Sequence, residues 1–304
     1  MKHYHHFVPT MCLLLVLLTA ASAWGYLQPS VNLGFTSFMD GAPPAGPGFY
    51  FTEYISYYTA DELANLAVPN PDIDVWVSLN QFIYQSNTPV LLGGKWGLDV
   101  IVPLVCIDST PLPDNGGGLG DILVGPYLQW DPIMGKNGPI FMHRVELQTI
   151  WPTGKYDDQK ALNPGSNFFS FDPYWAGTYF ITPQWTASWR LHYLWNAEND
   201  EPFVGFMANE SQAGQAFHAN FATSYELVPK KLRLGINGYY FDQLTDSKFN
   251  DEDTNDDEEV FAIGPGALVS FSQNTHLFLN AYFETGAEFR SEGERFVVRL
   301  VHHF

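Results

Sequence analysis

The amino-acid sequence predicts an all-β protein, a transmembrane antiparallel up-and-down β-barrel of about twelve strands. Three observations predict this fold. Apolar and polar residues alternate with a period of two along several segments, as in strands with one face toward lipid and one toward water. Long and short connections alternate along the later part of the chain, as they do between the two rims of such a barrel. No segment after residue 25 has the ~18 consecutive apolar residues of a membrane-spanning helix.

The N-terminus has the features of a signal peptide. Lys2 precedes an apolar run over residues 11–18, and Ala21-Ser-Ala matches the small-residue pattern of a cleavage site. The run is too short for a helix that crosses a membrane, so we expect it to be removed. We predict that residues 1–23 are a signal peptide cut before Trp24, and that the mature protein reaches the bacterial outer membrane.

The mature chain is predicted to have two parts. Residues 24–47 look irregular, because Gly and Pro recur between Asp40 and Gly48. Residues 48–304 contain strand-like runs separated by turn residues, and we assign this range to the outer-membrane barrel. The predicted strands cover 48–59, 72–85, 94–106, 119–130, 139–152, 168–181, 184–195, 214–228, 230–243, 257–272, 275–287 and 292–304.

The alternation is clearest near residues 185–195. Trp189 and Leu191 fall on one face of this strand, and Arg190 and His192 fall on the other. An apolar outer row and a polar inner row suit a wall between lipid and a water-filled lumen. We therefore expect Leu191 to face lipid and Arg190 to face the lumen.

The C-terminal stretch has the same pattern. Phe296, Val298 and Leu300 share one face, Arg299 lies on the other, and the chain ends on Phe304. A terminal aromatic residue on such a strand looks like the signal by which the outer-membrane barrel assembly machinery recognises its clients. We predict that Phe304 is an assembly signal and that this machinery is a partner.

The rhythm of the connections separates a barrel from other β folds. Residues 196–213 and 244–256 are long connections, whereas 228–230 and 272–274 are tight turns. Outer-membrane barrels have long outer loops and short periplasmic turns. We expect the outer loops near 60–71, 107–118, 153–167, 196–213, 244–256 and 288–291, and longer turns than usual at 86–93 and 131–138.

The composition limits the kinds of partner that the protein can bind. The formal net charge is -19, and removal of residues 1–23 takes away one lysine and no acid, which leaves -20 (-19 - 1). Such acidity excludes nucleic acid as a partner, since binding phosphates requires Lys and Arg. Cys106 is alone in the mature chain, so no intramolecular disulfide forms. The acidic stretch 250–259 is either a solvated outer loop or a place for divalent-ion bridges to lipopolysaccharide, which we expect around the protein together with outer-membrane lipid.

By alternation, many charged side chains should point into the lumen. They could pair with each other across strands, or arginines could form a strip that orients anionic or phenolic solutes. Both interpretations stay open from the sequence, and neither a metal site nor a cofactor is expected. The candidate lumen and solute-contact residues are Arg144, Glu146, Arg190, His192, Arg233, Arg299, Tyr127, Tyr239 and Tyr282.

Five short motifs also occur in order along the chain. They are Asp40-Gly-Ala-Pro-Pro, Gly118-Leu-Gly-Asp-Ile-Leu-Val-Gly-Pro, Pro152-Thr-Gly-Lys-Tyr, Asn163-Pro-Gly-Ser-Asn and Ala262-Ile-Gly-Pro-Gly. Together they resemble the phenol meta-pathway degradation protein family, a group of outer-membrane, transporter-like barrels, over most of the mature chain. The resemblance implies a channel or transporter that passes small, often aromatic or hydrophobic, compounds. It brings no catalytic residues, so we do not expect an enzyme.

Two alternative function classes stay open. An outer-membrane barrel enzyme that acts on lipid would need a serine and a histidine close together, and the sequence contains no Gly-x-Ser-x-Gly motif. A secreted β-sandwich binding module would also have alternating strands, with its polar face in water outside the molecule. Such a module would be soluble without detergent.

Overall fold

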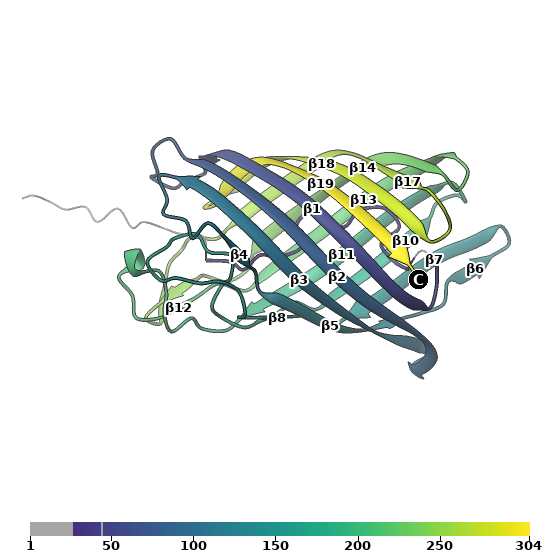
Figure 1. The fold of residues 1–304 in the computed structure, drawn as a ribbon, viewed down its shortest axis with the longest axis horizontal. Coiled ribbons are helices and arrows are strands. Elements are labelled where there is room, and N and C mark those ends of the chain that lie inside the picture. The colour runs from purple at the N-terminus through teal and green to yellow at the C-terminus, as the bar shows by residue number, and fades with distance from the viewer. Residues whose placement is uncertain (1–26, 44) are drawn as a thin grey trace, which may run out of the picture.

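The computed structural model describes residues 27–43 and 45–304 (Figure 1). The predicted signal peptide and its cleavage site before Trp24 lie outside the described residues. Within them the chain forms a closed antiparallel β-barrel of twelve strands with a few short extra strands, which confirms the predicted fold. No helix in this part of the chain is long and apolar enough to cross a membrane.

Three of the wall strands consist of two consecutive pieces. β4 continues β5 along β3, β8 continues β7 along β5, and β9 continues β10 along β11. The wall contains β1 (Gly48–Leu63), β2 (Asp72–Leu91), β3 (Gly94–Thr110), β4 (Gly117–Leu119), β5 (Ile122–Gln129), β7 (Gly138–Glu146), β8 (Thr149–Trp151), β9 (Ser170–Phe171), β10 (Tyr174–Phe180), β11 (Trp185–Asn196), β13 (Ala216–Val228), β14 (Leu232–Gln243), β17 (Glu259–Ser270), β18 (Thr275–Glu288) and β19 (Ser291–His303).

The remaining short elements lie at the rims. β6 (Ile133–Gly135) pairs with the start of β7. The outer loops hold β12 (Ser211–Gln212), β15 (Lys248–Phe249) and β16 (Glu252–Asp253), which form a small sheet of their own, and the 3-10 helix η1 (Val204–Phe206). Figure 1 shows these loops at the end of the barrel opposite the C-terminus.

The first and last strands close the ring. β1 pairs antiparallel with β19, from Tyr50 opposite His303 to Leu63 opposite Ser291. Each wall strand therefore has a neighbour on both sides, and closure removes the unpaired edges that an open sheet would present. The closed ring rules out the β-sandwich alternative, because a sandwich consists of two separate open sheets.

Side chains alternate across the wall as the sequence predicts. Along β11, Trp185 is 45% exposed whereas Arg190 is 4% exposed. Along β19, Leu300 is 39% exposed whereas Arg299 is 6% exposed. The outer surface is thus apolar on these strands, and the charged side chains point inward.

β2 departs from this arrangement. Part of its inward row is apolar and includes Val77 and Leu79, which pack against the buried core. Polar side chains lie on the outer row at the same level, where Ser78 donates a hydrogen bond to Glu53 of β1 over 2.8 Å. The lumen is therefore not polar all round, and the wall near β2 contributes apolar side chains to the interior.

The two long turns expected at the periplasmic rim are extended hairpins. β2 continues to Leu91, and the turn itself consists of Leu92 and Gly93, whose φ angles are 51° and 78°. Positive φ at both central residues is typical of a type I′ turn, which matches the twist of two antiparallel strands. β6 and β7 form a second hairpin in the range 131–138. The predicted long turns at 86–93 and 131–138 are wrong in extent, because most of their residues continue the strand pairing and only short turns remain.

Residues 27–43 and 45–47, which we call the strap, lie inside the barrel. Phe35 packs edge-on against Tyr54 of β1, and the Gly34 N–H donates to Asn220 of β13 over 2.7 Å. Gln28, at one end of the strap, contacts Asn196 at the outer end of β11, and the other end joins β1 at Gly48. The irregular N-terminal residues therefore run along the lumen from the outer rim to the periplasmic rim.

Candidate functional site: the strap and the lumen

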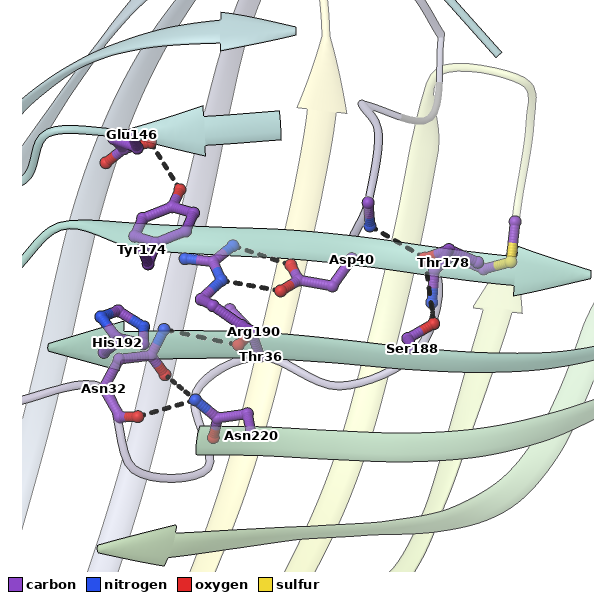
Figure 2. Close-up of polar contacts among 12 residues, drawn as sticks. Asn32, Thr36, Asp40, Glu146, Tyr174, Thr178, Ser188, Arg190, His192 and Asn220 are labelled. Atoms are coloured by element: carbon purple, nitrogen blue, oxygen red, sulfur yellow. Dashed lines mark hydrogen bonds and ion pairs between the residues drawn. The ribbon is translucent and has the colours of Figure 1, made fainter. Parts of the chain in front are cut away.

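The strap is held to the wall by hydrogen bonds from several strands. The Gly41 N–H donates to Thr178 over 2.9 Å, and the Met39 N–H donates to Ser188 over 3.0 Å. Gln129 donates from its amide to the Gly41 carbonyl over 3.0 Å. Figure 2 shows the contacts with Thr178 of β10 and Ser188 of β11, beside the residues of the lumen site described below, whereas Gln129 belongs to β5. The strap thus fills much of the interior and is fixed along its length.

Close backbone approach explains one of these contacts. A Cβ atom on Gly41 would lie 2.3 Å from the Met142 carbonyl oxygen and 2.5 Å from the Thr178 nitrogen. Only glycine allows the strap to come this near to β7 and β10.

A charged cluster lies where the strap passes the middle of β11. The Arg190 guanidinium donates two hydrogen bonds to the Asp40 carboxylate, from Nε over 2.7 Å and from Nη2 over 2.8 Å. Both side chains are more than nine-tenths buried. Such a bidentate pair has a strongly preferred geometry, so it fixes the strap to the wall.

The same cluster includes two aromatic rings. Arg190 lies over the Tyr174 ring, 4.1 Å from its centroid, and Tyr174 donates to Glu146. Arg144 lies 5.5 Å from the Tyr174 centroid and 5.3 Å from that of Tyr127. The predicted residues Arg144, Glu146, Arg190 and Tyr127 therefore meet in one place, around a tyrosine that was not predicted. Figure 2 shows Glu146, Tyr174 and Arg190 of this cluster.

The other two predicted tyrosines lie under the strap. The rings of Tyr239 and Tyr282 are 5.2 Å apart, and a Cβ atom on Gly34 would contact both. Tyr239 donates a hydrogen bond to Glu284 over 2.6 Å. Both tyrosines are fully buried and narrow the lumen, but they support the strap rather than line an open passage.

The two remaining arginines have different surroundings. Arg233 donates to the Gln184 carbonyl over 3.2 Å and to the Thr186 hydroxyl over 3.3 Å. Arg299 lies 3.6 Å from the centroid of the Phe278 ring. Arg233 and Arg299 therefore have separate neighbours. Only Arg144 and Arg190, among the four predicted arginines, contact the same ring, that of Tyr174.

His192 belongs to a buried group that could hold a metal ion. Its Nδ1 is 3.1 Å from one carboxylate oxygen of Asp172, and Nε2 of His218 is 3.0 Å from the other. One possible ligand atom from each residue lies within 4.8 Å of the others. The carboxylate also accounts for the group without a metal, because it accepts a hydrogen bond from each ring. No metal site is expected from the sequence, and Asp172 and His218 are not among the predicted site residues.

A largely apolar cavity of about 280 Å³ lies between the strap and the wall. Its walls include the inward rows of β2 and β3, among them Val77, Leu79 and Ile101, and strap residues such as Phe35. Arg190 lines the same cavity. The volume is near the lower end of the ~300–1,000 Å³ typical of small-molecule sites. The arrangement can hold a compact apolar molecule next to a guanidinium.

Three of the five motifs that carry the family resemblance meet at the outer rim. The Asp121 carboxylate accepts hydrogen bonds from the Gly154 N–H over 2.9 Å and from the Ser166 N–H over 2.7 Å. Asn163 accepts a hydrogen bond from the Asp157 N–H over 3.0 Å. Three motifs that are separate in the sequence therefore build one rim above the cavity.

The carboxyl group of Glu258 lies at the outer end of the strap, near Gln28. Burial raises the pKa of Glu258 to about 7, although Arg290 and the Gln28 N–H act in the opposite direction. Glu258 lies in the loop before β17, and its carboxylate is 3.7 Å from Arg290. Its charge therefore changes near neutral pH, next to the strap.

Phe304 lies at the periplasmic rim. Its side chain is 75% exposed, and its N–H donates to the Phe49 carbonyl over 3.0 Å. The exposed ring at the end of the closing strand is accessible to a partner, and its role as an assembly signal stays a prediction.

Sequence reasoning missed Asp40, Tyr174 and the apolar rows of β2 and β3. Asp40 belongs to a Gly/Pro motif, and it is also the one charged residue between positions 27 and 47. A lone charge in an apolar, irregular segment is a usable signal, because such a charge needs a partner when the segment is buried. Nothing in the sequence gives the identity of that partner.

Comparisons with known proteins agree with the fold. An outer membrane channel from Pseudomonas putida F1 is similar, with a TM-score of 0.75 and 16% identity over 90% of this chain and 100% of that chain. The translocator domain of the autotransporter NalP from Neisseria meningitidis is similar with a TM-score of 0.51 and 11% identity, over 88% of this chain and 90% of that chain. Among curated proteins, none matches this sequence.

The family assignment comes from the sequence itself. Residues 59–300 match the family described as "Putative MetA-pathway of phenol degradation". This range begins within β1 and ends within β19, so it covers nearly the whole barrel wall. The chain belongs to this family of outer-membrane-type β-barrels.

Proposed function

We propose that the protein is an outer-membrane channel that passes small apolar compounds, including aromatic ones. The apolar cavity of about 280 Å³ inside the closed barrel carries this proposal. A water-filled porin would have a polar interior, whereas here the inward rows of β2 and β3 offer apolar side chains to a solute. The proposal involves neither catalysis nor a cofactor.

The comparisons support the same function. The similar protein from Pseudomonas putida F1 is named an outer membrane channel, and the family description refers to phenol degradation. The apolar outer rows of β11 and β19 suit contact with outer-membrane lipid, and the acidic outer loops suit contact with lipopolysaccharide through divalent ions. The barrel assembly machinery would insert such a protein, with Phe304 as its signal.

The cavity gives a direct test of transport. Val105 lines the cavity, whereas the neighbouring Leu104 is 51% exposed on the outer face. Val105→Trp should fill the cavity and slow the entry of phenol into liposomes about tenfold or more, because the solute loses its apolar site. Leu104→Trp adds the same side chain outside the lumen and should leave entry unchanged.

Three results would count against this function. Entry of phenol no faster than into empty liposomes would remove the channel role. An equal effect of both tryptophans would mean that the cavity is not the route. Recovery of the wild-type protein as a soluble periplasmic protein would exclude the outer membrane as its location.

A further inference from the structure

The strap carries only one charged side chain. Most of its contacts with the wall are hydrogen bonds between neutral groups, such as those of Gly34, Met39 and Gly41. Asp40 differs because the charge is its own, and its carboxylate accepts two hydrogen bonds from Arg190 in the interior. Figure 2 shows the carboxylate pointing from the strap directly at the guanidinium.

Arg190 also belongs to the cavity. It lines the space that Val77, Leu79 and Phe35 enclose, and its guanidinium stacks on Tyr174. A planar guanidinium beside aromatic and aliphatic side chains is a good site for a carboxylate joined to an apolar body, since the fork binds both oxygens and the walls cover the rest. Arg144, whose guanidinium lies 5.5 Å from the centroid of the same ring, adds positive charge nearby.

The acid that lines the cavity does not compete for this role. Asp121 is held by the Gly154 and Ser166 N–H groups in the outer loops. Lys160, Arg290 and Arg295 also line the cavity. A solute that enters it therefore meets largely apolar walls, these cations and, at Arg190, a cation that a carboxylate already occupies. That carboxylate belongs to the strap itself.

We propose that Arg190 and the cavity form a binding site for small apolar carboxylates, and that Asp40 occupies the carboxylate position of this site in the closed channel. A solute anion and Asp40 then compete for the same guanidinium, and binding of the solute releases the middle of the strap. This proposal rests on the channel function above and adds its substrate class and its means of opening.

Benzoate and the neutral benzyl alcohol are matched probes, because they share a ring and differ in charge. Their binding to the mature protein in lipid nanodiscs can be measured by calorimetry, with empty nanodiscs subtracted. Asp40→Asn should raise the affinity for benzoate about tenfold or more, since the internal competitor is gone, and should change that for benzyl alcohol less than about twofold. Asp40→Asn combined with Arg190→Gln should lose the gain. Asp108→Asn, an equal change of charge on the exposed outer face of β3, should match the wild type.

A measurement on the wild-type protein tests the same proposal without any variant, and so does not depend on whether a variant folds. Benzoate should speed chymotrypsin cleavage of the strap at Phe35 or Phe38 in the unmodified protein, whereas benzyl alcohol should not. An unchanged cleavage rate with saturating benzoate would contradict release of the strap.

The remaining outcomes separate this site from the channel role. Equal gains for both probes in Asp40→Asn would mean that the pair only anchors the strap, and the carboxylate site would be rejected. Phenol transport without any benzoate effect would leave the channel function standing and overturn this inference. The predicted benzoate pattern in a protein that transports no probe would uphold the site and reject the channel.

Discussion

Single residues decide whether the strap can lie in the lumen. Gly41 is the clearest case, because backbone atoms of β7 and β10 occupy the space where its side chain would be. Asp40, its neighbour, supplies the charge that meets Arg190. Two consecutive residues thus fix the strap: Asp40 through its ion pair with Arg190, and Gly41 through its close approach to β7 and β10.

Gly41→Ala should weaken docking of the strap by about 1–3 kcal/mol, because the added methyl group forces backbone atoms apart. Chymotrypsin should then cut the strap faster in the folded barrel. Ser30→Ala, at an exposed strap position, is the control and should leave the rate unchanged. Equal cutting of Gly41→Ala and the wild type would mean that the wall adjusts at no cost.

Arg190→Gln should destabilise the protein by about 3–5 kcal/mol, since it leaves the Asp40 carboxylate buried without its ion pair. Asp40→Asn in the same chain should recover part of this loss. Unfolding by urea in lipid vesicles gives the four free energies of the double-mutant cycle. Additive effects would contradict direct coupling of the two side chains.

At the scale of the strand, position in the alternation decides what a substitution costs. Leu191 lies on the outer row of β11, between the buried Arg190 and His192. Leu191→Arg should destabilise the barrel by about 2–4 kcal/mol, if it lies near the middle of the membrane. Leu244→Arg places the same change in an outer loop, where Leu244 is already exposed, and should be nearly neutral. Comparable losses in vesicle unfolding would show that the outer row of β11 does not face lipid.

The alternation predicted most strands but not all of their faces. β11 and β19 have one charged row and one apolar row, so their lumen faces could be read directly from the sequence. β3 has Asp99 on its inward row, but its neighbours are apolar on both rows, with Ile101 inward and Leu104 outward, so the alternation indicates its direction only weakly. β2 has its apolar row inward because the strap and cavity lie against it. A rule that assumes a polar lumen fails where part of the chain fills the lumen.

The candidate site was also predictable only in part, because the strap contributes to it. Tyr127, Glu146 and Tyr174 are neighbours because β5, β7 and β10 pair in register, and pairing of successive strands follows from the fold. The contact between Asp40 and Arg190 joins positions 150 residues apart and depends on the path of an irregular segment. No periodic pattern gives that path.

The whole molecule should respond to pH through Glu258. Burial raises its pKa from 4.5 to about 7, so the folded protein binds this proton more tightly than the unfolded chain does. The resulting stabilisation is fully present below about pH 4.5 and is lost as the pH rises through about 7. Glu258→Gln removes the titration, so the difference in unfolding free energy between wild type and variant should change over this range. A constant difference from pH 4 to 8 would contradict the raised pKa.

The position of the strap also sets an order of events during assembly. Its partners on β10, β11 and β13 are 137 to 186 residues further along the chain, so the earliest described segment cannot find its place until those late strands exist. The strap also leads directly into β1, which closes the ring by pairing with β19. Contacts of such long sequence range form slowly. The strap is therefore among the last segments to become ordered, although it precedes every strand, and the β1–β19 seam encloses it as it closes.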